Sequence, residues 1–446
     1  MAKKTRIIVF DDDPTGSQTV HGCLLLTRWD VATLTVALED AAPLFFILTN
    51  TRGVDAAHAA AITREACHNL KIALATQDIQ PVFVSRSDST LRGHYPVETD
   101  VIAKELGPFD AHFLVPAFFE GGRITRASVH YLVSEGREIP VHETEFARDS
   151  VFGYRHSYLP DYVEEKTGGR IKAQSVVRLQ LEDLRRGVYE QLLSLRDNAC
   201  VVVDAEKQDD LDRFAADLLK AAGQGKRFLF RSAASLITSL AHLPPQPVPG
   251  AQMAQYVRGH APGAVIVGSH VPRTTRQLGE LLKQPDVMPI EVDVNRLTEE
   301  RATLLKQVLT EAEFAHRMKR IPVVYTSRTE RRFPDQRARL AFGEQVSGFL
   351  MDVVRGLPRT LGFLVSKGGI TSNDVLSSGL ALRTARLLGQ ILPGVSVVRC
   401  PHDHPRYPDL PVVIFPGNVG DDRALATVVE RLHPAAGVRR AGAARS

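Results

Sequence analysis

The stretch RIIVFDDDPTGS, residues 6–17, joins a short apolar run to three aspartates and a turn. The run predicts a buried β-strand, because it is short and rich in β-branched and aromatic residues. Asp11, Asp12 and Asp13 then stand where the strand ends, and Pro14–Ser17 predicts a turn. Strand formation does not require three carboxylates, so the stretch raises the question of what they bind.

Similar apolar runs recur along the chain and predict further strands. In the first half they are LFFILTN (44–50), PVFVSR (81–86), HFLVPA (112–117), CVVVDA (200–205) and, more weakly, RFLFRSA (227–233). In the second half they are AVIVGSH (264–270), PIEVDV (289–294), PVVYTSR (322–328), LGFLVSKGG (361–369), VSVVRC (395–400) and PVVIFPGN (411–418). Stretches with helical spacing separate them, such as residues 56–77 and 373–389. Alternating strands and helices predict an α/β fold with a mainly parallel sheet flanked by helices.

The segment LPPQPVPG, residues 243–250, has four prolines in eight positions and predicts a linker. We therefore expect two α/β domains, residues 1–245 and 250–432, each with its own sheet. The tail, residues 433–446, is predicted to be disordered because it is basic and poor in large apolar side chains.

Composition narrows the class of protein. The 446 residues are 44% hydrophobic and 24% charged, as in ordinary globular proteins. The net charge of +4, from 55 basic and 51 acidic residues, is too balanced to indicate a nucleic-acid or membrane partner. No apolar run approaches the ~18 residues of a membrane span. The four cysteines are far apart, which favours reduced thiols and a cytoplasmic location.

Polar and charged residues follow the strands of the first half, where ligands of parallel sheets bind. They are Asp12, Asp13 and Thr15, then Arg52, then Arg86, Asp88, Ser89 and Arg92, and finally Arg123. Carboxylates accept hydrogen bonds from hydroxyl groups, and arginine forks bind carboxylates, so the set fits a small hydroxylated acid. Asp, Thr and Ser at such positions are also typical of caps and turns, Arg123 can be an ordinary surface residue, and Asp88 can simply pair with Arg92.

The strand ends of the second half are rich in glycine. They supply Gly268 and Ser269, then Gly368, Gly369, Ile370 and Thr371, and last Gly417, Asn418 and Gly420. Glycine lets backbone N–H groups approach a phosphate, although a plain turn capped by Ser372 or Asn373 fits the middle loop equally well. The P-loop, dinucleotide, zinc-protease and serine-hydrolase motifs are missing, which weighs against those four classes.

Taken in order, these motifs resemble those of the four-carbon acid sugar kinases, the family of 3-oxo-tetronate, threonate and erythronate kinases. The matching segments are DDPTGS (12–17), DSTLRG (88–93), the block 116–144, VVVDAE (201–206), GSHVPRTTRQ (268–277), SKGGITSNDV (366–375) and PGNVGDDRAL (416–425). The chain departs from the family at Asp11, where Ala is usual, at Val271, where Ser is frequent, and at Phe415, where Lys is frequent.

The resemblance implies a kinase that uses ATP and Mg²⁺, with the sugar acid on the N-terminal domain, the nucleotide on the C-terminal domain and the reaction in the cleft between them. It makes Asp12, Asp13, Asp88 and Arg92 catalytic, and it assigns Thr15, Arg52, Arg86, Ser89 and Arg123 to the substrate. It assigns the glycine-rich set, with Ser269, Ile370, Thr371 and Asn418, to nucleotide binding. The resemblance assigns no metal ligands. A homodimer is one oligomeric state that stays open. Two other functions remain open: a non-catalytic sugar-acid sensor and an NAD-dependent sugar-acid dehydrogenase.

Overall fold

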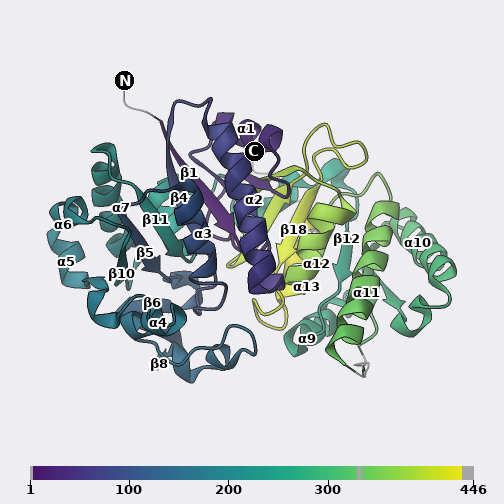
Figure 1. The fold of residues 1–446 in the computed structure, drawn as a ribbon. Helices are drawn as coiled ribbons and strands as arrows, with labels where there is room; N and C mark the ends of the chain where they lie inside the picture. Colours follow the sequence, from purple (N-terminus) through teal and green to yellow (C-terminus); the bar gives the residue numbers. More distant parts are fainter. Residues whose placement is uncertain (1–3, 329–332, 334, 434–446) are drawn as a thin grey trace. The chain divides into compact units, whose positions relative to one another are not determined.

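The chain folds into two compact units, Met1–Pro245 and Gln246–Ser446. A computed structural model describes residues 4–328, 333 and 335–433. Each unit contains a mainly parallel sheet flanked by helices, which confirms the predicted fold class (Figure 1). The units divide within the proline-rich segment 243–250, and the predicted tail from 434 onward lies outside the described residues. None of the helices within the described ranges is long and apolar enough to cross a membrane.

The sheet of the first unit has the strand order β2-β3-β1-β4-β11-β5-β10-β9, and every neighbouring pair is parallel. Its strands are β1 (Lys4–Asp11), β2 (Leu24–Leu26), β3 (Leu44–Leu48), β4 (Ile79–Arg86), β5 (Ala111–Val115), β9 (Val177–Leu179), β10 (Ala199–Val203) and β11 (Phe228–Ser232). The six runs predicted as strands in this half are confirmed, whereas β2 and β9 are too short to have been predicted.

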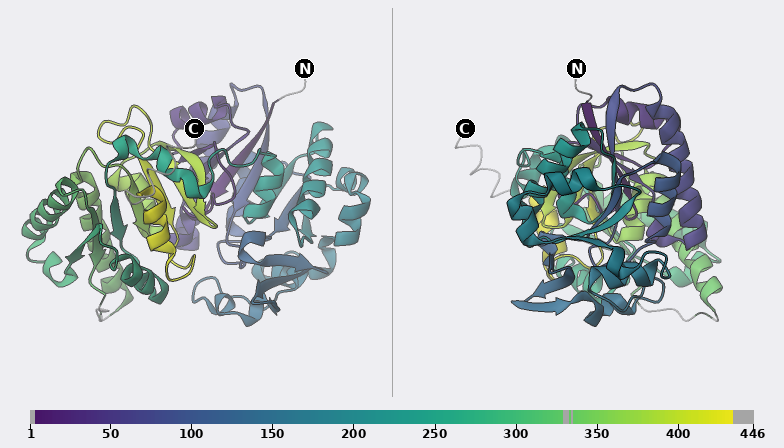
Figure 2. Two further views of the ribbon diagram at one scale, coloured as in Figure 1. Left: turned by 180° about the vertical axis from the view of Figure 1, so that it is seen from behind. Right: turned by 60° about the vertical axis from the view of Figure 1, so that its left-hand side comes forward.

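Helices cover both faces of this sheet. They are α1 (Val31–Glu39), α2 (Ala56–Leu74), α3 (Val97–Leu106), α4 (Leu159–Lys166), α5 (Leu181–Arg186), α6 (Tyr189–Ser194), α7 (Gln208–Gly223) and α8 (Ala234–Ala241). Helix α2 begins where the Asp55 side chain accepts a hydrogen bond from the His58 N–H at 2.9 Å, as in an ordinary N-cap. Helices α2 and α3 pack on one face, and α7 covers the other (Figures 1 and 2).

A small antiparallel sheet of three strands follows β5. It comprises β6 (Arg123–Arg126), β7 (Val129–Ser134) and β8 (Arg137–Pro140). Behind it, Tyr154, Tyr162 and Val141 form a buried cluster with Leu91, which belongs to the loop after β4. This insertion therefore rests against the loop that carries the DSTLRG motif.

The sheet of the second unit has the strand order β13-β14-β12-β15-β18-β17-β16, in which β16 and β17 pair antiparallel and β17 also pairs antiparallel with β18. Its strands are β12 (Ala264–Val267), β13 (Val287–Val292), β14 (Ile321–Thr326), β15 (Leu364–Lys367), β16 (Thr384–Leu392), β17 (Val395–Arg399) and β18 (Pro411–Phe415). The helices are α9 (Pro272–Leu281), α10 (Arg301–Arg317), α11 (Gln336–Gly356), α12 (Gly369–Asp374) and α13 (Ala424–Leu432).

The prediction of one helix over 373–389 is wrong. Helix α12 ends at Asp374, one π-helical turn continues to Gly379, and Thr384–Leu392 is strand β16. The apolar residues of this stretch fit either period, and the following Pro393-Gly394 closes a hairpin that pairs β16 with β17.

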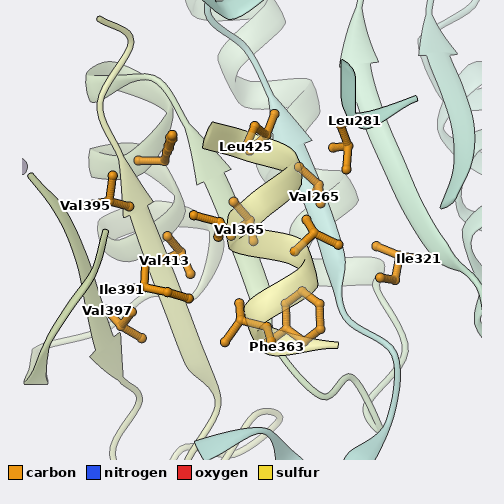
Figure 3. Packing of buried hydrophobic residues seen from close by; sticks show 14 of the residues in the cluster. Val265, Leu281, Ile321, Phe363, Val365, Ile391, Val395, Val397, Val413 and Leu425 are labelled. Atoms are coloured by element: carbon orange, nitrogen blue, oxygen red, sulfur yellow. The ribbon is translucent and has the colours of Figure 1, made fainter. Parts of the chain in front are cut away.

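One hydrophobic cluster of the second unit lies between the sheet and helices α9 and α13. Val265, Val365 and Val413 come from three adjacent strands and pack against Leu281 and Leu425 of the two helices (Figure 3). All five side chains are fully buried, so each burial is worth roughly 1.5–3 kcal/mol. This packing holds the carboxyl ends of β12, β15 and β18 in fixed positions.

Candidate active site

In the first unit, strand register brings the predicted polar residues to one edge. Asp11 is level with Leu48 and with Arg86, and Arg86 is level with Ser232. The segments after β3, β1, β4 and β11 therefore start side by side. The predicted residues Asp12, Thr15, Arg52, Arg86, Asp88, Ser89 and Arg92 all lie in or next to these segments.

Arg52 joins two of the aspartates. Its guanidinium donates to Asp12 Oδ1 at 2.5 Å and to Asp13 Oδ2 at 3.0 Å. Asp12 is only 1% exposed, and its Oδ2 also accepts from Ser87 Oγ at 2.9 Å. Asp13 is 21% exposed, and its Oδ1 accepts from the Thr15 N–H and hydroxyl. Of these two carboxylates, Asp13 is the one that reaches the surface.

Asp11, the residue without a counterpart in the family motif, is fully buried beneath the turn. Its Oδ1 lies 3.4 Å from Arg86 Nη1, and its Oδ2 has no hydrogen-bond partner among the described residues. A Cβ atom at position 16 would lie 2.0 Å from Asp11 Oδ1, so only glycine fits there. Burial raises the pKa of Asp11 to about 8, and the charge of Arg86 only partly opposes this.

The proton on Asp11 predicts a pH-dependent stability. The folded chain holds this proton up to about pH 8, whereas the unfolded chain loses it near pH 4, so the free energy of unfolding falls as pH rises between them. Replacing Asp11 with Asn removes this dependence. Relative to the wild type, the variant should gain up to about 1.4 kcal/mol per pH unit between pH 5 and 7, measured by urea unfolding. The exposed carboxylate control Glu65→Gln should show no such trend, and an equal trend in both variants would contradict the assignment.

A buried arginine that the sequence analysis missed forms hydrogen bonds close to these carboxylates. Arg231 on β11 donates to Ser85 Oγ at 2.7 Å, to Glu98 Oε2 at 2.6 Å and to Ser87 Oγ at 2.6 Å. Its Nη2 also lies 4.0 Å from Asp12 Oδ2. The available signal was an arginine inside the apolar run RFLFRSA, where a strand alone would place an apolar side chain.

The second part of the site is formed by Asp88, Arg92 and Arg123. Asp88 Oδ2 accepts from Arg92 Nε at 2.8 Å and from the Thr90 hydroxyl, while its Oδ1 accepts from no described group. Burial alone would raise the pKa of Asp88, but the charges of Arg52 and Arg92 and these hydrogen bonds lower it below the usual range. Arg123 donates to Gly121 O, and its buried Nε has no partner in the described part of the chain.

Side chains from other parts of the unit hold the loop that carries Asp88 and Arg92 by donating hydrogen bonds to its backbone carbonyl groups. Three successive carbonyls each accept a side-chain hydrogen bond: Ser89 O from His130 Nε2 (2.8 Å), Thr90 O from Tyr154 Oη (2.7 Å) and Leu91 O from Tyr162 Oη (2.8 Å). Burial lowers the pKa of His130 to about 4, so the ring is neutral, donates from Nε2 and accepts from the Thr125 hydroxyl at Nδ1. The conformation of the loop is therefore set largely by groups other than the Asp88 and Arg92 side chains.

Loss of one of these bonds should be measurable as stability. Tyr162→Phe leaves Leu91 O buried without its hydroxyl donor, which should lower the free energy of unfolding by about 1–3 kcal/mol. Tyr158→Phe is the matched control, because the Tyr158 ring stacks on Arg178 while its hydroxyl makes no hydrogen bond to the described residues. Urea unfolding of both variants tests this, and an equal loss in the two would rule out a specific role for the Tyr162 hydroxyl.

In the second unit the three glycine-rich loops converge. A Cβ atom at Gly268 would lie 2.4 Å from Thr371 Oγ1, and one at Gly368 would lie 2.8 Å from Ser269 Cβ. Gly368 also has a φ of +118°, which favours glycine. Position 417 approaches the same point, since its Cβ would lie 3.4 Å from Ser269 Oγ. Gly369 begins helix α12, and the Ile370 side chain is 73% exposed at its tip.

Helix α9 begins at this cluster without a side-chain cap. Its N-cap residue is Val271, whose side chain cannot accept a hydrogen bond, and Pro272 follows at the first helical position. Arg273 Nη1 instead reaches across to Asn418 O at 2.8 Å. An uncapped helix N-terminus, glycine loops and a nearby arginine together favour an anion.

A separate cavity lies away from both clusters. It measures ≈ 280 Å³ and is lined at the amino ends of β4 and β11 by residues such as Ile79, Pro81 and Phe228. Ligands of parallel sheets bind at the carboxyl ends of strands, and the charged networks lie there, so this cavity is not the candidate site.

Family comparisons match both units. A sugar-binding N-terminal domain model matches residues 7–240, and a nucleotide-binding C-terminal domain model matches residues 264–425. The chain is also similar to a D-erythronate kinase of Heliobacterium modesticaldum (strain ATCC 51547 / Ice1), with 29% identity over 225 residues. That match covers 47% of this chain and 47% of the relative, so it spans about half of each.

Solved structures show the same fold. A Salmonella typhimurium LT2 protein with a provisional tRNA synthase assignment has a TM-score of 0.67 at 17% identity, covering 95% of this chain and 98% of that chain. Haemophilus influenzae protein HI1011, from the family DUF1537, has a TM-score of 0.65 at 17% identity, covering 95% of this chain and 100% of that one. The two domain models together cover most of the sequence, and the chain therefore belongs to the four-carbon acid sugar kinase family.

Proposed function

We propose that this protein is an ATP-dependent kinase that phosphorylates a hydroxyl group of a small, four-carbon sugar acid. The observation that carries the proposal is the contrast between the two clusters. One unit presents carboxylates and arginines with unused hydrogen-bonding atoms, and the other presents convergent glycine loops beside an uncapped helix. A hydroxylated acid fits the first cluster and a polyphosphate fits the second.

In the first unit, Asp13 and Asp88 are the carboxylates we assign to the substrate hydroxyls, because Asp13 is partly exposed and Asp88 Oδ1 has no described partner. Arg92 and Arg123 are assigned to the substrate carboxylate, since the Arg123 Nε donor is unused. Asp12 is buried between arginines, so we give it a positioning role through Arg52.

The charge state of these carboxylates bears on mechanism. Burial opposes ionisation of Asp13 and Asp88, yet the arginines around them lower the pKa of both. Such carboxylates are weak bases, and they are better suited to orient a hydroxyl than to remove its proton before attack. A loose phosphoryl transition state needs little deprotonation in advance, and the arginines would neutralise charge nearby.

In the second unit, the ATP phosphates are assigned to the loops at Gly268–Ser269, Gly368–Thr371 and Gly417–Gly420. Within the described ranges no group of three His, Cys, Asp or Glu side chains could hold a metal ion. This fits Mg²⁺ that arrives on the phosphates and keeps most of its waters. Bound there, Mg²⁺ would neutralise phosphate charge during transfer.

The test is an ATP-consumption screen with Mg²⁺ over threonate, erythronate, their 2- and 3-oxo forms and related four-carbon acids. Turnover with one acid, and formation of its phosphate ester, would support the proposal. Nucleotide binding is measured in parallel by calorimetry. ATP binding without turnover of any acid would contradict this substrate class, and acid binding without ATP binding would favour a sensor. Reduction of NAD⁺ by an acid would favour a dehydrogenase.

A further inference from the structure

The loop after β18 has an unusual distribution of hydrogen bonds. Four successive carbonyls accept side-chain donors: Pro416 O from Lys367 Nζ (2.5 Å), Gly417 O from Thr274 Oγ1 (3.2 Å), Asn418 O from Arg273 Nη1 (2.8 Å) and Val419 O from Gln277 Nε2 (2.9 Å). Lys367 Nζ also lies 3.3 Å from Gly417 O. The carbonyl oxygens of these four peptide groups are therefore occupied by side chains of the same unit.

The N–H groups of the same loop are unused. Those of residues 417 to 420 donate to no group within the part of the chain that the structure describes. These four residues are partly or fully exposed, unlike Pro416 before them. Successive unused N–H groups on a loop whose carbonyls are bonded by side chains can bind an anion.

Lys367 is the donor whose presence needs an explanation. It is 0% exposed, and no carboxylate in the described residues pairs with it. Its ammonium lies 3.8 Å from the centre of the Phe415 ring, and the charged group that acts on it is another cation, Arg273 of helix α9. A buried lysine without a counter-ion is costly unless an anion binds close by.

We propose that Lys367 is a positioning residue of the nucleotide site, which holds the carbonyls of Pro416 and Gly417 so that the N–H groups of this loop face the phosphates, and which gains a proton when nucleotide binds. The inference rests on the proposed function. Lys367 lies in the apolar run of β15, next to Phe415, and its hydrogen bonds hold the glycine loop that follows β18.

The physical basis is linkage between an anion and a buried cation. Burial lowers the pKa of Lys367 to about 7, and the neighbouring Arg273 acts in the same direction. Negative phosphates near the loop favour the charged ammonium and raise that pKa in the bound state. The bound protein then holds more protons than the free protein, so affinity falls as pH rises above about 7, by at most tenfold per pH unit.

The experiment measures ADP and ATP binding to the full chain by calorimetry between about pH 7 and 9, in two buffers of different ionisation enthalpy. In the wild type we expect proton uptake and an affinity that falls with pH. Lys367→Met, which removes the donor but keeps an apolar stem beside Phe415, should bind about 10- to 100-fold more weakly at pH 7 and lose the uptake. Lys367→Arg keeps a fixed charge, so it should bind without the uptake.

Lys283→Met is the control, because Lys283 is an exposed lysine of the same unit that pairs with Glu280. It should keep both the affinity and the pH dependence. If the wild type binds nucleotide and the two Lys367 variants retain its proton uptake, the inference is overturned while the proposed function stands. If the wild type binds neither nucleotide at any pH, both are overturned.

Discussion

Replacing Asp88 with Asn is expected to lower kcat/KM for the sugar acid by about 10²–10³-fold, with most of the loss in kcat. Asp88 is held by Arg92 and Thr90 on one oxygen and presents the other without a described partner. The amide keeps the size of the side chain but removes the charge that orients a hydroxyl and opposes the arginines. Initial rates with ATP and the best acid of the screen measure the effect.

Asp149→Asn is the matched control for this variant. Asp149 also faces Arg92, at 3.8 Å, but it lies farther out and its carboxylate accepts the N–H groups of Val151 and Phe152. We expect its kcat/KM to stay within about threefold of the wild type, because a long, partly exposed ion pair contributes little. Equal losses in the two variants would mean that the effect arises from Arg92 rather than from Asp88. Unchanged kcat/KM in Asp88→Asn would remove Asp88 from the site.

Much of the candidate site was predictable because it follows strands. Apolar runs identify buried strands, and parallel strands bring their carboxyl ends to one edge, so the residues after β1, β3 and β4 could be grouped from the sequence alone. The contrast between charged ends in one unit and glycine-rich ends in the other is likewise a local property of the sequence. The sequence alone also shows that the common nucleotide-binding motifs are missing.

The supporting groups were not predictable from such patterns. His130, Tyr154 and Tyr162 bond to the loop after β4 from 41 to 71 residues farther along the chain, and the insertion that contains the small sheet brings them there. Arg231 and Lys367 lie within apolar runs, and their partners depend on strand order rather than on spacing. A charged residue inside a predicted buried strand is the signal that sequence reasoning could have used.

Arg231→Met is expected to lower the free energy of unfolding by about 3–5 kcal/mol, the largest stability loss we predict. The guanidinium is buried and bonds with Glu98, Ser85 and Ser87, close to Asp12. Methionine fills a similar volume but leaves the buried carboxylate of Glu98 without its cation. Urea unfolding at pH 7 measures the loss.

A double variant separates the effect of the unpaired Glu98 carboxylate from the effect of lost packing. Adding Glu98→Gln to Arg231→Met removes the uncompensated charge, so part of the stability should return even though the packing at position 231 is unchanged. Arg126→Met is the control, since the pairs of Arg126 with Glu138 and Glu206 lie at the surface and should be worth about 1 kcal/mol or less. If Arg231→Met costs no more than Arg126→Met, the buried network does not depend on this cation. If the double variant recovers nothing, the loss comes from packing and hydrogen bonds rather than from an unpaired carboxylate.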